Sequence, residues 1–62
     1  MTKLKEQRRT LHFTQKQVAE KIGVSYQQYQ GYENGRFAPN VYMAIEIAKA
    51  LDSTVEKLFK RE

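Results

Sequence analysis

The side chains of this sequence that could do chemistry are mainly amides and phenols. The amides of most interest are those of Gln15, Gln27, Gln28 and Gln30. A glutamine amide can bond bidentately to N6 and N7 of adenine, or singly to a phosphate oxygen. Glutamine is also a good helix former, and propensity alone explains its presence on an ordinary wet helix. The position of each glutamine in its helix therefore has to decide between the two interpretations.

Catalytic and metal chemistry find little support in the composition. The chain has no cysteine and a single histidine, His12, so neither a Cys/His nor a Ser/His/Asp set can be assembled. A helix-terminal position is the simpler interpretation of His12. A chain of 62 residues is also too small to enclose an ordinary substrate pocket. We expect no enzyme, no catalytic residue, no metal site, no cofactor and no small-molecule ligand.

Two short helices with a tight turn between them must position the amides. Thr14 supplies a good N-cap oxygen for a helix over residues 15–22, and Gly23 can take the positive φ of a sharp turn. Apolar residues at helical spacing form the inward face of this helix: Val18, Ala19 and Ile22. These signals predict a helix that ends abruptly at Gly23.

The second helix is expected over residues 26–34. Ser25 is an N-cap with Gln28 at capping-box spacing, Tyr29 and Tyr32 face inward, and Gly35 ends the helix. Helix, glycine turn, helix is the pattern of a helix-turn-helix, whose second helix enters the major groove of DNA.

Short sequence elements at fixed spacing strengthen this interpretation. They are Thr14-Gln15, Val18-Ala19, Gly23-Val24-Ser25, Tyr32-Glu33-Asn34-Gly35, Pro39 and the closing Leu51-Asp52-x-x-Val55-x-x-Leu58-Phe59. With them, the chain resembles the phage repressor and Cro-type helix-turn-helix family over roughly residues 4–59. The resemblance implies a sequence-specific transcriptional regulator of double-stranded DNA. We expect a repressor that binds a palindromic operator as a homodimer.

The resemblance also assigns roles to individual residues. Tyr26, Gln27 and Gly31 match base-facing positions, and Gln30 lies close to that face. Phosphate contacts are implied for four residues: Gln15, Ser25, Asn34 and Arg36. A structural ion pair is implied between Arg8 and Glu33.

Two positions depart from the family pattern. Gly31 stands where relatives commonly present a side chain to a base, so it either lets DNA approach closely or contributes no readout. Tyr29 replaces a smaller aliphatic residue, and its hydroxyl needs a partner or solvent. Tyrosines can also stack on single-stranded bases. Helical spacing instead favours the core for Tyr29 and Tyr32 and leaves Tyr26 for DNA.

The rest of the chain predicts three further helices, over residues 2–11, 41–51 and 54–60. Leu4, Arg8 and Leu11 share one face of the first, and His12 follows it at a position that requires positive φ. Asn40 is the expected N-cap of the fourth helix, and Ser53 with Glu56 has capping-box spacing before the fifth. The expected fold is one all-α domain over residues 1–62, a compact five-helix lambda-repressor-like bundle.

Composition constrains partners and compartment. The net charge is +4 and the pI about 9.6, which favours a polyanionic partner only if the charge lies beside the helix pair. No apolar run approaches the ~20 residues of a membrane span, and no signal peptide is visible, so we expect a cytoplasmic protein without membrane contact.

A chain this short, without disulfides, gains stability from dimerisation. The apolar candidates for a dimer interface are Phe37, Tyr42, Leu58 and Phe59. Leu58 and Phe59 are equally well explained as core residues of the monomer.

A second functional hypothesis is an antitoxin-like interaction module. Such a module would neutralise a partner protein through an apolar C-terminal surface and use DNA binding for autoregulation.

Overall fold

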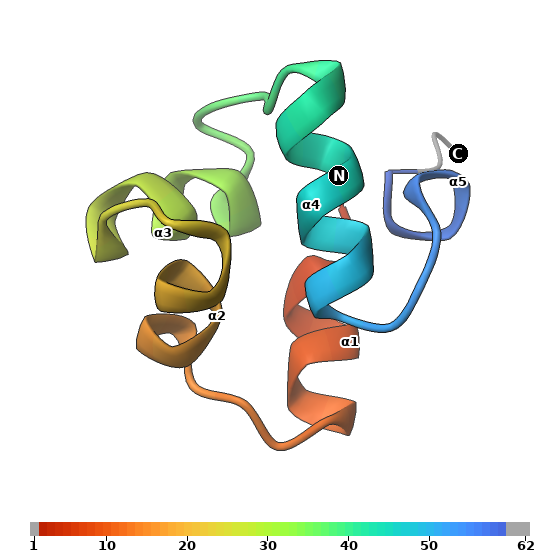
Figure 1. The fold of residues 1–62 in the computed structure, drawn as a ribbon, viewed down its shortest axis with the longest axis horizontal. Helices are drawn as coiled ribbons and strands as arrows, with labels where there is room; N and C mark the ends of the chain where they lie inside the picture. The colour runs from red at the N-terminus through yellow and green to blue at the C-terminus, as the bar shows by residue number, and fades with distance from the viewer. Residues whose placement is uncertain (1, 60–62) are drawn as a thin grey trace.

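The computed structural model describes residues 2–59, and in that range it is built from helices alone (Figure 1). In chain order they are α1 (Leu4–Thr10), α2 (Gln15–Ile22), α3 (Tyr26–Asn34), α4 (Val41–Ala50) and α5 (Val55–Leu58). The all-α, five-helix prediction is confirmed, and the predicted bounds of α2 and α3 agree with the structure. The predicted helix over 2–11 is shorter at both ends, and α4 ends one residue early. The last helix, predicted over 54–60, excludes residues 54 and 59, and residue 60 lies outside the described range.

Side-chain caps explain where α2, α3, α4 and α5 begin. The Thr14 hydroxyl accepts a hydrogen bond from the Gln17 backbone N–H at 3.1 Å, and the Gln17 side chain accepts one from the Thr14 N–H at 2.8 Å. Ser25 and Asn40 cap α3 and α4 as predicted. Each cap satisfies a backbone N–H that has no partner within the helix.

Two predicted capping boxes are corrected. Ser25 accepts from the Gln28 backbone, but the Gln28 amide donates to the Tyr32 hydroxyl at 3.1 Å instead of returning to Ser25. The N-cap of α5 is Thr54, which accepts from the Lys57 N–H, so the predicted box of Ser53 with Glu56 is wrong. Both predicted boxes have suitable residue spacing, but in the folded chain Gln28 bonds to Tyr32 and Thr54 takes the capping position instead of Ser53.

Residues with left-handed backbone mark the turns. Gly23 at the end of α2 has φ 74°, and His12 after α1 has φ 61°, as its predicted position requires. Asp52 after α4 has φ 51°. The Gly23 turn is what brings α3 directly across α2.

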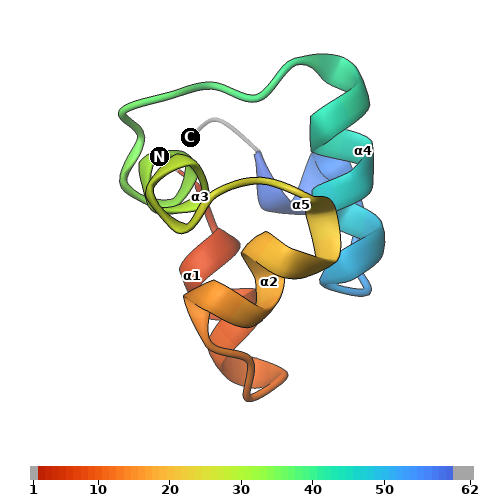
Figure 2. The same cartoon turned by 60° about the vertical axis from the view of Figure 1, so that its left-hand side comes forward.

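The core lies where α4 packs between α2 and α5, while α1 packs against α3 (Figures 1 and 2). Its buried members come from every helix: Leu4, Val18, Ala19, Tyr29, Tyr32, Ile47, Ala48, Leu51 and Leu58. Four of the residues predicted to face inward are among them, whereas Ile22 is only partly buried against the core. The loop between α3 and α4 arches across one end of the domain (Figure 2). Thus α3 is held from behind by α1 and α2, which leaves one of its faces open.

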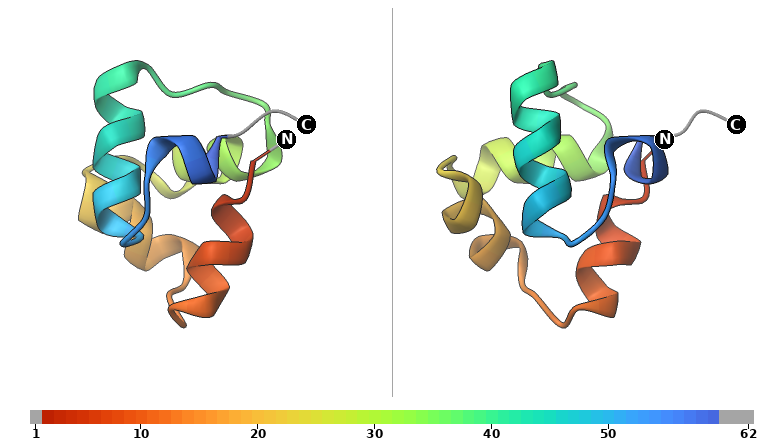
Figure 3. Two further views of the ribbon diagram at one scale, coloured as in Figure 1. Left: turned by 90° about the vertical axis from the view of Figure 1, so that its right-hand side faces the viewer. Right: turned by 45° about the vertical axis from the view of Figure 1, so that its right-hand side comes forward.

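Polar contacts join α1 and the residue before it to the ends of α4 and α5. The Lys3 N–H donates to the Leu58 carbonyl at 2.9 Å, so α5 lies beside the start of α1 (Figure 3). The Gln7 amide donates to the Leu51 carbonyl at 2.8 Å at the end of α4.

Two of the residues considered for a dimer interface pack within the domain itself. Leu58 is 2% exposed and belongs to the core, and Phe59 is half-buried against it. A fully buried side chain cannot form a surface for a second copy. The apolar side of α4 is only partly covered, because Val41 and Ile45 are exposed beside Tyr42. Among the described residues, no helix is long and apolar enough to cross a membrane.

Candidate nucleic-acid interface

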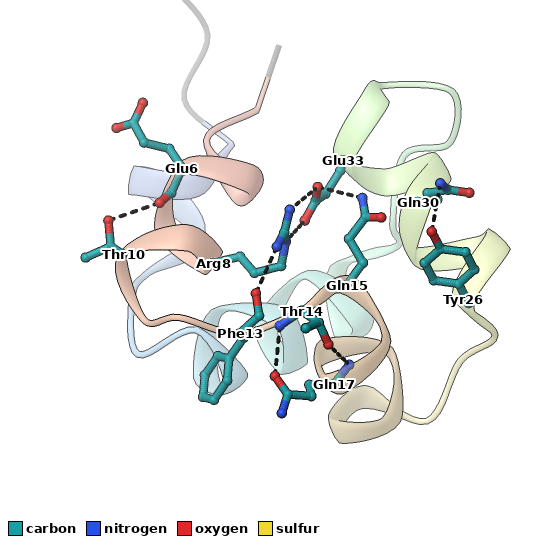
Figure 4. A network of polar contacts seen from close by, with 10 residues as sticks. All are labelled: Glu6, Arg8, Thr10, Phe13, Thr14, Gln15, Gln17, Tyr26, Gln30 and Glu33. Atoms are coloured by element: carbon teal, nitrogen blue, oxygen red, sulfur yellow. Dashed lines mark hydrogen bonds and ion pairs between the residues drawn. The ribbon is translucent and has the colours of Figure 1, made fainter.

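The outward face of α3 carries the polar side chains predicted to read bases. Tyr26 and Gln27 are exposed in its first turn, and Gln30 is half-exposed one turn after Tyr26. The Gln30 amide donates to the Tyr26 hydroxyl at 3.3 Å (Figure 4). Tyr29 and Tyr32 anchor the opposite side of the helix in the core. The structure therefore brings Tyr26, Gln27 and Gln30 together on one open face.

Gly31 does not belong to that open surface. It is buried, and the ring of Phe37 lies over it: a Cβ added at Gly31 would fall among the ring atoms, 3.1 Å from Cγ and closer still to Cδ2 and Cε2. The expectation that Gly31 itself faces a base is therefore corrected. Absence of a side chain at this position makes room for Phe37, and nothing in the sequence pattern signalled that contact.

The N-terminus of α2 borders a shallow hollow in front of α3. Six residues line this hollow: Arg8, Phe13, Thr14, Gln15, Lys16 and Tyr26. Free backbone N–H groups and the helix dipole at such an end attract phosphate. Lys16, which the residue pattern had not singled out, adds an exposed positive charge at the same end.

Gln15 also belongs to a buried network (Figure 4). Arg8 Nε donates to Glu33 Oε2 at 2.6 Å and Arg8 Nη2 to Glu33 Oε1 at 3.3 Å, so the predicted ion pair is present. Arg8 Nη1 donates to the Phe13 carbonyl at 2.8 Å. The Gln15 amide donates to Glu33 Oε1 at 2.9 Å. These bonds tie α1, the start of α2 and the end of α3 into one unit.

The network fixes the charge of its members. Burial opposes ionisation of Glu33, but the hydrogen bonds donated to it, above all by Arg8, outweigh burial and hold the pKa of its carboxyl below the ordinary value. The hydrogen bond to Glu33 likewise raises the pKa of Arg8. Glu33 is therefore a structural carboxylate that stays ionised, as the sequence interpretation required.

Tyr29 lies fully buried beside this pair. Its hydroxyl makes no hydrogen bond within the described residues, so the expected partner for this oxygen is not found. Burial, followed by the neighbouring Glu33 carboxylate, raises the pKa of the phenol and keeps it neutral.

The other predicted phosphate contacts lie at the ends of α3. Ser25 is exposed, although its hydroxyl already caps the helix. Asn34 and Arg36 are exposed at the far end, where Asn34 Oδ1 accepts from the Arg36 N–H at 3.0 Å. The side chain of Arg36 carries the positive charge at this end. Within residues 2–59, no three His, Cys, Asp or Glu side chains gather as a metal site would require.

The fold and this face define a class of protein: a small helical domain that presents one helix of a helix-turn-helix to the major groove. A helix-turn-helix family model matches residues 4–58, and the chain belongs to that family, the Cro/C1-type DNA-binding transcriptional regulators, which are not enzymes.

Individual relatives agree with this assignment. The transcriptional repressor RstR of the cryptic phage CTXphi in Vibrio cholerae is 36% identical over 59 residues, which cover 95% of this chain but 53% of the relative. An HTH-type transcriptional regulator of Methanothermobacter thermautotrophicus is 40% identical over 50 residues, 81% of this chain and 72% of its own. The Bacillus subtilis regulator YgzD is 32% identical over 57 residues, 92% and 86% of the two chains. This chain thus spans about half the length of RstR.

Proposed function

We propose that this regulator is a repressor that binds a palindromic operator as a homodimer and reads bases through the open face of α3. The proposal depends on how the side chains of α3 are divided between its two faces. Tyr26, Gln27 and Gln30 face outward, while Tyr29 and Tyr32 pack the helix against the core. A rigidly held helix can present a bidentate amide to a base edge in one orientation. The name of RstR supports a repressor. Such a protein acts in the compartment that holds the DNA, in keeping with the expected cytoplasmic location.

Gln27 is the proposed principal base-reading residue. It is exposed in the first turn of α3, the part of a recognition helix that enters the groove, and its amide matches N6 and N7 of adenine. Tyr26 and Gln30, which bond to each other, flank it on the same face. Gln15, Ser25, Asn34 and Arg36 are proposed to position the protein on phosphates at the two ends of this face.

The proposed dimer surface is the exposed apolar side of α4. Val41, Tyr42 and Ile45 are exposed there, and Tyr42 is 78% exposed. One small module makes few base contacts, and a two-fold dimer doubles them on two half-sites. The antitoxin-like alternative depended on apolar C-terminal residues, but Leu58 and Phe59 pack in and against the core of the domain itself.

Selection of bound sites from random duplex DNA tests the reading face. The selected operator and its single-base changes are then titrated with three variants at several salt concentrations. Gln27→Ala should lose discrimination at one base pair, because a good bidentate contact contributes about 1–3 kcal/mol. Gln15→Ala should weaken binding evenly across sequences, and Arg36→Ala should lower the salt slope by about one, because one charge is removed. Full wild-type base preference in Gln27→Ala would refute the proposed face.

Sedimentation and footprinting test the dimer. Tyr42→Asp should weaken self-association and shorten the footprint to one half-site, while far-UV circular dichroism stays unchanged. Glu46→Gln, on the same helix and exposed, is the control. A wild-type protein that sediments as a monomer on and off its operator would reject the dimer.

A further inference from the structure

Phe37 lies on the recognition helix although it belongs to the loop after it. Its ring covers Gly31 so closely that a Cβ there would overlap ring atoms. The backbone holds it in place, because the N–H groups of Arg36 and Phe37 both donate to the Gly31 carbonyl, at 2.9 Å and 3.1 Å. Phe37 is therefore fixed to α3 by its main chain as well as by its ring.

The position of the ring relative to Gln27 gives it a part in the open face. Gly31 follows Gln27 by four residues, so the two lie on the same side of α3 one turn apart. Phe37 is 44% exposed, and Gln27 is exposed one turn before Gly31. Phe37 thus supplies at Gly31 an apolar surface that Gly31 itself lacks.

Glycine within a helix is destabilising relative to alanine, and a half-exposed phenylalanine leaves apolar area in water. If the ring is covered when DNA binds, this apolar area is removed from water and binding is favoured. The apolar group that the major groove offers is the C5-methyl of thymine, which phenylalanine can contact. One helical turn is about 5.4 Å and one base step about 3.4 Å, so this thymine lies one or two base pairs from the base that Gln27 reads.

We propose that Phe37, held on Gly31, is a specificity-determining residue that contacts a thymine C5-methyl group in each half-site. The proposal rests on the proposed function, because it needs α3 in the major groove. It gives Phe37 a different role from the dimer contact expected from the sequence.

Replacement of thymidine by deoxyuridine isolates the methyl group. Each thymidine of the selected operator is replaced in turn, in both half-sites together, and binding is measured by fluorescence anisotropy. For the wild-type protein, one pair of symmetry-related positions should lose about fourfold per half-site, the equivalent of about 0.8 kcal/mol for one buried carbon group. Phe37→Ala should bind the thymine operator more weakly and show no further loss at that position.

Two further variants separate the ring from its surroundings. Gly31→Ala keeps Phe37 but displaces its ring, so it should also lose the methyl sensitivity. Glu46→Gln changes an exposed side chain of α4 that lies in neither proposed surface, and it should keep the wild-type ratio between the two operators. Circular dichroism of each variant verifies that it is folded.

Three results would overturn the proposal. Deoxyuridine sensitivity that persists in Phe37→Ala would remove Phe37 from readout. Loss of self-association in Phe37→Ala, with its methyl sensitivity intact, would assign the ring to the interface between copies. Failure of the wild-type protein to select any duplex would refute the proposed function itself. This outcome is distinct from the other two, because the site selection is done before the variants are measured.

Discussion

Removal of the Glu33 carboxylate is the perturbation for which the structure gives the clearest magnitude. Glu33→Ala deletes both bonds from Arg8 and the bond from Gln15. The Arg8 side chain is 11% exposed and that of Glu33 3%, so water cannot replace the lost partner without rearrangement. Arg8 would keep only its bond to the Phe13 carbonyl among these contacts, and a buried positive charge would lose its counter-ion.

Breaking one side of a buried ion pair costs about 3–5 kcal/mol, against about 0–1 kcal/mol for an exposed pair. A domain of 62 residues has a total stability of about 3–9 kcal/mol. The variant should therefore retain little of its stability. With at least about 4 °C per kcal/mol for a domain of this size, Tm should fall by 12 °C or more, or the domain should be unfolded at room temperature.

Thermal unfolding followed by circular dichroism at pH 7 measures this effect. The matched control is Glu46→Ala, which removes an exposed glutamate from α4 and should shift Tm by only a few degrees. Equal Tm values for the two variants would show that the pair contributes no more than a surface charge, and the argument from burial would fail.

Two other predictions concern pH and the core. The folded-state pKa of Glu33 is lowered, so its contribution to stability is present above the unfolded-state pKa of about 4.3 and is lost as pH falls through the folded value. Tm of the wild type should therefore decline more steeply below about pH 4 than Tm of Glu33→Gln, and parallel pH profiles would contradict this. Leu58→Ala should cost about 2–5 kcal/mol in urea unfolding because Leu58 is buried in the core, whereas Tyr42→Ala at a protein concentration that keeps the chain monomeric should cost almost nothing. A larger loss of unfolding free energy for Tyr42→Ala than for Leu58→Ala would place Leu58 at an interface instead of in the core.

Local signals predicted the helix pair well. Thr14, Ser25 and Asn40 act as caps, and Gly23 and Gly35 end their helices, because these signals depend on a few adjacent residues. The inward faces of α2 and α3 follow from 3.6-residue periodicity in the same way. The Arg8–Glu33 pair spans 25 residues, and it was reached through the family resemblance rather than through spacing.

Contacts between distant segments were not predictable from local pattern. Thr54 rather than Ser53 caps α5, although both have a suitable hydroxyl. The choice depends on how the turn after α4 packs. Phe37 folds back onto Gly31, and Gln15 bonds to Glu33 across 18 residues. Each of these contacts becomes visible only when the helices are placed in space.

The bond between Gln15 and Glu33 has a consequence for the entropy of DNA binding. A glutamine side chain that is free in solution loses up to about 1.5–2 kcal/mol of rotamer freedom when it is fixed. In this protein folding has already restricted Gln15, because its amide is held by a carboxylate that is itself held by Arg8. An amide nitrogen carries two hydrogens, so one can bond Glu33 and the other can bond a phosphate. If Gln15 contacts a phosphate of the operator as proposed, that phosphate meets a donor whose conformational freedom was already lost on folding.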